Sequence, residues 1–294
     1  MNYTTISFPG LGIELNPPSS FSVGPLTVHF YGLIIATGLV LAVIYCLRRK
    51  EQFGISENDL LDGILWIVPF AIVCARAYYC IFSWDTYKDD PISVLYIWNG
   101  GLAIYGGVIG AVIGILIHCK WKKLNPLAVL DLVSLGFLIG QCMGRWGNFF
   151  NREAFGEATD CFIRMGLYNP ATGVTEYYHP TFLYESLWNL CGFILLHFLS
   201  KKRRYDGQVA LGYMAWYGLG RALIEGLRTD SLWWGPFRVS QVLAAISCIV
   251  AVVILIYQSR RPHDPQDLFC NKVRAAKAQV KEAAEDTAEN SEEN

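Results

Sequence analysis

The chain has 294 residues, of which 53% are hydrophobic and 17% charged, with a mean hydropathy of +0.31 and a formal net charge of −1. A soluble domain carries about 25% charged residues, so this composition predicts a protein that crosses a membrane several times. The small net charge gives no general attraction to nucleic acid. The nine cysteines lack any CxxC pair and indicate neither a disulfide framework nor a metal site.

Residues 1–27 are polar and rich in proline, which predicts a lead-in on the extracytoplasmic side. Residues 28–260 are expected to form one membrane domain, because they hold seven apolar stretches long enough to cross about 30 Å of hydrocarbon. A polar loop, 145–180, separates the fourth stretch from the fifth, and a charged cytoplasmic tail, 261–294, follows the seventh. The expected spans are 28–47, 60–84, 98–118, 127–143, 181–199, 208–227 and 240–257.

The third stretch carries glycines at every fourth position, Gly106, Gly110 and Gly114. Residues four apart share one face of a helix, and small residues there let another helix approach closely. We therefore expect Gly110 and Gly114 to pack against a neighbouring helix. For Gly106 and Gly107, which flank Tyr105 as Gly100 and Gly101 do, the alternative is that they leave room for a ligand or break the helix.

The basic residues define a topology for these spans. The loops after the first, third, fifth and seventh stretches hold 12 Lys and Arg residues, whereas the opposite loops hold 6. Because cytoplasmic loops carry the excess of Lys and Arg, the N-terminus is predicted outside and the C-terminus in the cytoplasm. Apart from Asp62 and Asp131 near the cytoplasmic ends, the charged residues within the spans then fall in the outer leaflet together with three tyrosines, which favours one polar cavity that opens there. These residues are Tyr31, Arg76, Tyr105, Arg145, Tyr184, Glu185, Arg221 and Glu225.

The densest polar segment is 144–156, Gly-Arg-Trp-Gly-Asn-Phe-Phe-Asn-Arg-Glu-Ala-Phe-Gly, which directly follows the fourth apolar stretch. A charge at membrane depth costs about 2.5–3.5 kcal/mol, so it indicates a functional site. Arginine donors suit phosphate oxygens, and a phospholipid is the abundant anion in that leaflet. We therefore predict that Arg76, Arg145 and Arg221 bind a lipid phosphate. The simpler alternative is that Arg145 reaches the interface and the rest forms a turn.

Segment 144–156 resembles the signature of bacterial prolipoprotein diacylglyceryl transferases, and further similarity lies in 29–33, 98–107, 179–185 and 217–228. The resemblance implies seven spans in a bacterial plasma membrane. It also implies transfer of the diacylglyceryl group of phosphatidylglycerol to the lipobox cysteine of a prolipoprotein signal peptide, with release of glycerol phosphate. The expected partners are these two substrates and membrane lipid, with no cofactor, no metal and no nucleic acid, and a monomer is expected.

The resemblance and the chemistry together suggest roles for individual residues. Arg145 and Arg221 are expected to stabilise charge on the leaving phosphate, while Glu225, four residues after Arg221, is expected to pair with it. The proton acceptor for the thiol stays open, because Tyr105 stands where some family members carry histidine and tyrosine is a poor base near neutral pH; the other candidates are Glu153, Glu185 and His179. The expected catalytic residues are Tyr105, Arg145, Asn148, Glu153 and Arg221, and the expected substrate-binding residues are Tyr31, Arg76, Arg145, Asn151, Gly156, His179 and Glu185.

Two other functions also fit a lipid-facing arginine site. One is a transporter of anionic solutes or phospholipid, although such proteins usually show internal repeats, and the sequence shows none. The other is a non-catalytic assembly factor that binds lipid, for which a lysine at residue 145 would serve as well as arginine.

Overall fold

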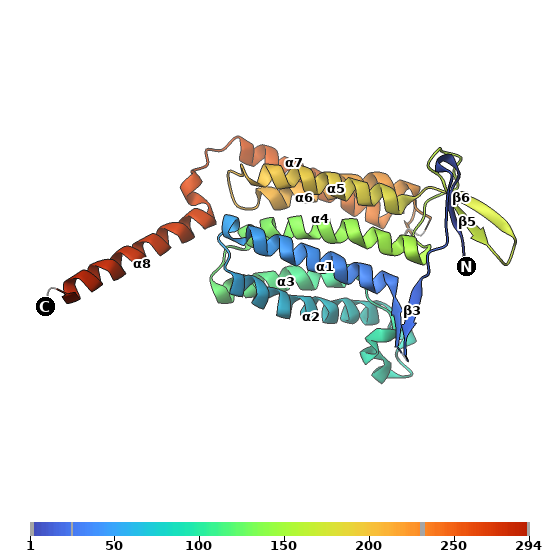
Figure 1. Cartoon of the computed structure of the whole chain (residues 1–294), viewed down its shortest axis with the longest axis horizontal. Helices are drawn as coiled ribbons and strands as arrows, with labels where there is room; N and C mark the ends of the chain where they lie inside the picture. The colour runs from blue at the N-terminus through green and yellow to red at the C-terminus, as the bar shows by residue number, and fades with distance from the viewer. Residues whose placement is uncertain (1–2, 25, 230–232, 293–294) are drawn as a thin grey trace. The chain divides into compact units, whose positions relative to one another are not determined.

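The computed structural model describes residues 3–24, 26–229 and 233–292; residues 1, 2 and 25 of the expected lead-in and residues 293 and 294 of the expected tail lie outside the described residues. The structure is mostly helical, as the sequence predicted. An additional helix, α8 (Phe269–Glu292), occupies the charged tail. The helices that correspond to the expected spans are α1 (Phe30–Arg49), α2 (Glu57–Phe82), α3 (Ile104–Lys122), α4 (Pro126–Asn151), α5 (Thr181–Ser200), α6 (Gln208–Ile224) and α7 (Val239–Ser259) (Figure 1).

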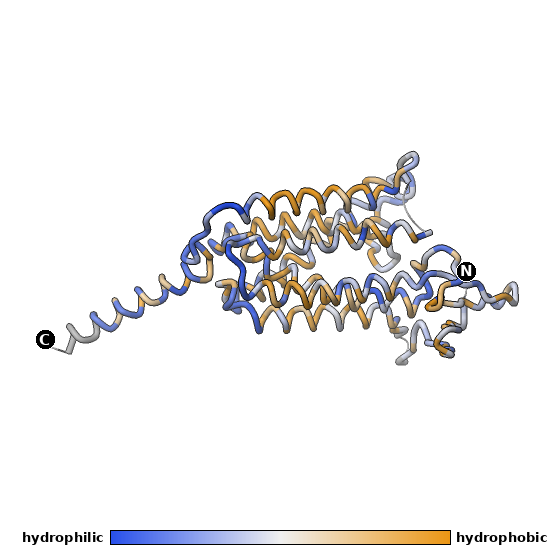
Figure 2. Tube along the Cα trace, turned by 90° about the horizontal axis from the view of Figure 1, so that it is seen from above, coloured by the Kyte–Doolittle hydropathy of each residue, from blue (hydrophilic) through white to orange (hydrophobic). Residues whose placement is uncertain are grey.

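Within the described residues, six helices have the length and apolar composition to cross a membrane. These are α1 with the short 3-10 turn that follows it, α2, α3, α4, α5 and α7. Helix α6 has 17 residues, fewer than the roughly 20 of a typical spanning helix. Figure 2 shows hydrophobic residues along the main helices and largely hydrophilic residues in the helix that leads to the C-terminus. The outward-facing apolar side chains, such as Leu65, Val73 and Ile249, suit a lipid environment.

Two helix boundaries differ from those expected. Helix α3 begins at Ile104 rather than near Trp98, because Gly100 and Gly101 have φ values of 83° and 75° that no helix accommodates. Helix α4 continues to Asn151, so the loop expected from residue 145 begins at Arg152 instead. The first half of the polar segment is therefore helical, and its side chains point from defined positions on a helix.

The chain divides into two compact units, each described here by itself. The first unit comprises Met1–Cys46 and Asp131–Asp264, and the second comprises Leu47–Leu130 and Pro265–Asn294. In the second unit α2 packs against α3 through the glycines predicted for this purpose. A Cβ atom at Gly106 would lie 2.6 Å from the carbonyl oxygen of Cys74, so the two backbones approach too closely for any other residue there.

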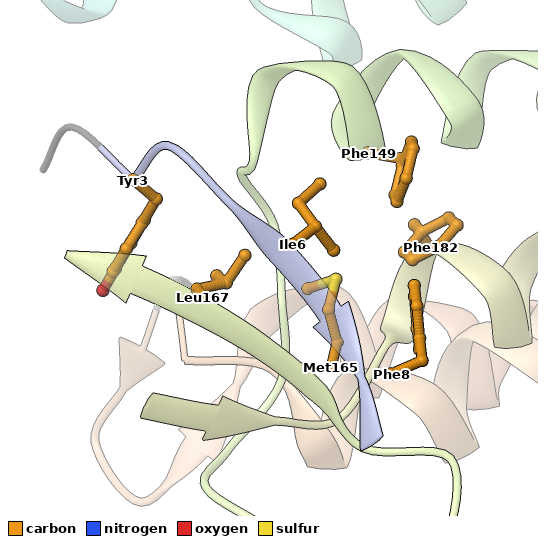
Figure 3. Packing of buried hydrophobic residues seen from close by; sticks show 7 residues of the cluster. All are labelled: Tyr3, Ile6, Phe8, Phe149, Met165, Leu167 and Phe182. Atoms are coloured by element: carbon orange, nitrogen blue, oxygen red, sulfur yellow. The ribbon is translucent and has the colours of Figure 1, made fainter. Parts of the chain in front are cut away.

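A small antiparallel sheet in the first unit has the strand order β2-β1-β5-β6. Ile6 of β1 pairs with Leu15 of β2 on one side and with Leu167 of β5 on the other. One face of the sheet buries Tyr3, Ile6, Phe8, Met165 and Leu167 against Phe149 of α4 and Phe182 of α5 (Figure 3). This core attaches the sheet to the end of α4 and the start of α5. The strands are β1 (Ile6–Phe8), β2 (Ile13–Leu15), β5 (Met165–Asn169) and β6 (Val174–Tyr178).

Two further strand pairs complete the described secondary structure. Strands β3 (Ser20–Val23) and β4 (Leu26–His29) pair antiparallel just before α1. Strands β7 (Trp233–Trp234) and β8 (Phe237–Arg238) pair in the same way just before α7. The pairing of β1 with β5, about 160 residues apart, has no local signal in the sequence.

Candidate active site

The last two turns of α4 present a row of polar side chains joined by hydrogen bonds. The Nη1 group of Arg145 donates to Oδ1 of Asn148 over 3.3 Å. The side-chain amides of Asn148 and Asn151 both donate to Oε1 of Glu153, over 3.1 and 3.2 Å. Since α4 continues to Asn151, residues 145 and 148 lie one turn apart on the same face. Four of the expected site residues thus form one connected group.

Glu185, in the second turn of α5, is the centre of a larger cluster of ionic groups. Its carboxylate lies 2.6 Å from Arg145 Nη2 and 3.3 Å from a guanidinium nitrogen of both Arg221 and Arg228. The Glu185 side chain is only 5% exposed, and a buried carboxylate is stable only when it is paired and hydrogen-bonded. We call Arg145, Arg221 and Arg228, together with Glu185, the arginine cluster.

Glu225 provides a second carboxylate beside this cluster. Its side chain is 2% exposed and lies 2.6 Å from Arg221 Nη2, which confirms the pair expected from the spacing of four residues. A guanidinium nitrogen of Arg238 also donates to the backbone carbonyl of Glu225. Among the described residues, the three guanidinium groups of the arginine cluster exceed the carboxylates of Glu185 and Glu225 by one positive charge, in a largely buried site. Such a site attracts anions, and its arginine forks match the geometry of phosphate oxygens.

Gly156 lies where the segment after α4 passes between the residues just before α5 and the short turn that follows α6. Its N–H donates to the carbonyl of His179 over 2.9 Å, and the next N–H, of Glu157, donates to the carbonyl of Leu227 over 2.7 Å. A Cβ atom at Gly156 would lie 2.7 Å from His179 Cβ and 2.8 Å from the Leu227 carbonyl. The site therefore requires glycine here for close backbone approach, and no unusual φ is involved.

Two expected substrate-binding residues lie near this group. The Tyr31 ring packs on Gly147, where a Cβ atom would be 2.8 Å away, so the glycine makes room for the tyrosine. His179 places Nδ1 3.2 Å from the hydroxyl of Tyr184. Both contacts are confined to the first unit.

Arg76 and Tyr105 belong to the second unit, so the structure does not test whether they share a site with Arg145. Arg76 is 6% exposed, and its guanidinium donates to the carbonyl oxygens of Ser93, Val94, Gly100 and Gly101 over 2.7–3.0 Å. It thereby holds the segment between α2 and α3 in place. Tyr105 lies in the first turn of α3 and is 37% exposed.

Two arginines with prominent contacts were not among the expected site residues. Arg228 is a member of the arginine cluster, and Arg152 holds the N-terminal segment through several carbonyl oxygens. The position of Arg228 had a detectable signal, because residues 221, 225 and 228 follow the spacing of one helical face. The contacts of Arg152 with Thr4 and Pro17 join residues more than 130 positions apart, and no local pattern in the sequence predicts them.

Comparisons with known proteins place this chain beside a single group. A family model described as prolipoprotein diacylglyceryl transferase matches residues 18–257. A relative from Limosilactobacillus reuteri (strain DSM 20016) is 42% identical over 260 residues, covering 86% of this chain and 94% of its own length. A relative from Listeria monocytogenes serotype 4a (strain HCC23) is 40% identical over 262 residues, covering 87% and 95%. One from Lactiplantibacillus plantarum (strain ATCC BAA-793 / NCIMB 8826 / WCFS1) is 41% identical over 260 residues, covering 85% and 91%. All three are named phosphatidylglycerol–prolipoprotein diacylglyceryl transferase.

Proposed function

Because this chain belongs to the prolipoprotein diacylglyceryl transferase family, we propose that its arginine cluster is the place where the family's reaction occurs. The enzyme transfers the diacylglyceryl group of phosphatidylglycerol to a prolipoprotein, which is the first step of lipoprotein maturation. The acceptor is the thiol of the lipobox cysteine, the new bond is a thioether, and glycerol phosphate leaves. The observation that carries the proposal is the convergence of Arg145, Arg221 and Arg228 on Glu185.

The charge of this cluster suits the chemistry of the leaving group. Phosphatidylglycerol carries a phosphodiester with one negative charge, and displacement at its glyceryl carbon releases a phosphomonoester that approaches two. Cations fixed in advance near the phosphate therefore stabilise the transition state more than the bound substrate. Arg145 and Arg221 serve this purpose, and Asn148 and Asn151 orient oxygen atoms beside them.

Among the three candidate proton acceptors in the first unit, the contacts favour Glu153. A free thiol is only a few per cent thiolate at neutral pH, so a base beside it accelerates attack. Three guanidinium groups already lie against the Glu185 carboxylate, so its oxygens are occupied by donors and are poorly placed to accept the proton of the thiol. The Glu153 side chain is exposed and accepts hydrogen bonds from two neutral amides, so it can be approached by a thiol. His179 Nδ1 is already beside the hydroxyl of Tyr184, which makes this nitrogen less accessible.

The remaining expected residues keep the roles predicted for them from the sequence. Tyr31, Arg76, His179 and Gly156 contact or admit the lipid and the peptide, and Tyr105 bonds the phosphate or the thiol. For the membrane topology we infer seven spans with α6 as the sixth, the N-terminus outside and the C-terminus in the cytoplasm. The excess of basic residues after α1, α3, α5 and α7 supports this orientation. The site then faces the outer leaflet of the plasma membrane, and the enzyme acts as a monomer.

The test uses purified full-length protein in detergent with phosphatidylglycerol and a lipobox peptide, and follows the mass of the peptide. We expect a gain of one diacylglyceryl group on the cysteine. The gain should be absent with Arg145→Ala and with a peptide whose cysteine is replaced by serine. A folded protein that binds phosphatidylglycerol but never modifies the peptide would refute the assignment. Flux of anionic solute or lipid across liposomes would then identify the transporter.

A further inference from the structure

Arg152, the first residue after α4, makes an unusually complete set of contacts with the N-terminal segment. Its Nε and Nη2 both donate to the carbonyl of Thr4, over 3.0 and 2.6 Å. Nη2 also donates to the carbonyl of Pro17 over 2.7 Å and to Oδ1 of Asn16 over 3.1 Å, while Nη1 donates to the carbonyl of Phe150 over 3.2 Å. All of these acceptors are neutral, so the guanidinium serves as a multiple hydrogen-bond donor and not as half of an ion pair.

The backbone of Arg152 is also unusual. Its φ is 55°, in the left-handed region that residues with a Cβ atom rarely adopt. This conformation reverses the chain after α4, so that the N–H of Glu153 donates to the carbonyl of Asn148 over 3.1 Å. The Glu153 carboxylate consequently lies beside the amides of Asn148 and Asn151. A strained conformation persists where the surrounding contacts hold it: the N–H of Arg152 donates to the carbonyl of Phe149 over 3.1 Å, and the guanidinium adds its contacts with the N-terminal segment.

The segment that Arg152 holds lies outside the region matched by the family model, which begins at residue 18. Thr4 precedes β1, and Asn16 and Pro17 follow β2, so the guanidinium spans both ends of this hairpin. The hairpin in turn packs on Phe149 and Phe182 beside the site. The contacts therefore connect a part of this chain beyond the family match to the turn that carries Glu153.

We propose that Arg152 is a positioning residue for Glu153, and that residues 4–17 serve through it as part of the scaffold of the active site. This inference rests on the proposed function, in which Glu153 accepts the proton of the thiol. Arg152 touches neither substrate nor reacting atoms. Its effect on the reaction passes through the left-handed turn, which keeps the Glu153 carboxylate on the two asparagine amides.

A simpler role for Arg152, general stability of the hairpin, predicts a different pattern of rates. If Arg152 acts through Glu153, its loss matters only while Glu153 is functional, so the effects of the two substitutions are not additive. If Arg152 supports only the overall fold, its loss lowers the rate by the same factor in either background.

The experiment measures kcat and KM of the purified full-length protein in detergent, with phosphatidylglycerol and a lipobox peptide, for Arg152→Ala, Glu153→Gln and the double variant. We expect Arg152→Ala to lower kcat at least about tenfold, with the KM for phosphatidylglycerol within about twofold of wild type. In the Glu153→Gln background the same change should cost less than about twofold. Equal factors in the two backgrounds would overturn the inference. Inactive wild-type protein would instead refute the proposed function, so the two failures are distinguishable.

Three further variants keep the test decisive. Arg152→Gly should retain more activity than Arg152→Ala, because glycine adopts the left-handed turn without strain; equal losses would show that the turn is not what Arg152 maintains. Asn16→Ala removes one acceptor of the guanidinium and leaves Arg152 in place. If Arg152→Ala fails to fold, the same test uses Asn16→Ala, whose effect should also be non-additive with that of Glu153→Gln. Arg164→Ala is the matched control, because Arg164 also donates to backbone carbonyls, of Asp160 and Cys161, and packs on the Tyr177 ring, without contacting the arginine cluster in the part of the chain that the structure describes. It should leave kcat unchanged.

Discussion

Replacing Glu185 with glutamine should expose how much the arginine cluster depends on one carboxylate. The change removes the negative charge shared by Arg145, Arg221 and Arg228, while Glu225 stays paired with Arg221. Removing one partner of a buried ion pair costs about 3–5 kcal/mol. The arginine side chains are 10–22% exposed, so we expect the lower end, about 3 kcal/mol. At roughly 2–4 °C for each kcal/mol, Tm should fall by about 6 °C or more.

The assay is thermal unfolding of the purified protein in detergent, with and without phosphatidylglycerol. The lipid should restore more of the lost Tm in Glu185→Gln than it adds to wild type, because a phosphate can replace the missing anion. Glu14→Gln is the matched control, since Glu14 is an exposed carboxylate of the same unit and should leave Tm unchanged. An unchanged Tm and unchanged lipid effect in Glu185→Gln would refute the idea that this carboxylate holds the arginines.

Three other changes test separate parts of the structure. Arg145→Lys keeps the charge but loses the guanidinium fork, so we expect activity to drop at least about 100-fold; near wild-type turnover would argue strongly for a non-catalytic lipid-binding role. Gly156→Ala forces a Cβ atom against His179 and Leu227 and should cost about 1–3 kcal/mol of stability along with activity. Gly140→Ala should be tolerated, because an added Cβ atom there would meet no side chain or neighbouring element within 4 Å. Equal effects of the two changes in thermal unfolding would contradict the packing argument. Deleting residues 277–294 should change neither Tm nor turnover, because residues 277–286 of α8 are exposed, whereas Leu268 and Cys270, where the helix begins, are buried. A large loss in a well-inserted protein would reveal a role for the tail.

The features that the sequence predicted correctly are those whose partners are close in sequence or share one helical face. The apolar stretches became helices, and Arg221 paired with Glu225 four residues later. The glycines of α3 indicated a packing face, and Gly106 lies against the backbone of α2. In each case the period of the helix alone determines which side chains point the same way.

The contacts that organise the candidate site could not be predicted in this way. Arg145 and Glu185 are 40 residues apart, on different helices, and nothing local selects one arginine for that carboxylate. Helix α4 continues to Asn151, beyond the end expected at residue 143, and Gly147 within it provides close contact with Tyr31 and no turn. Arg76 was expected at a lipid phosphate for its charge alone. Two of its four carbonyl partners belong to Gly100 and Gly101, whose positive φ values the charge of the arginine does not predict.

The presence of Glu185 inside a site proposed to bind a phosphate has a direct catalytic consequence. In the free enzyme this carboxylate already occupies the guanidinium groups, so an incoming phosphodiester with one negative charge competes with it and gains little in binding. As the phosphorus–oxygen group approaches two negative charges, the arginines favour it increasingly over the carboxylate. The cluster then stabilises the transition state more than the ground state, and this difference raises kcat. Stronger binding of the lipid in both states would lower KM and leave kcat unchanged. On this reasoning, Glu185→Gln should lower the KM for phosphatidylglycerol and lower kcat together, and a variant that lowered KM while kcat rose would contradict it.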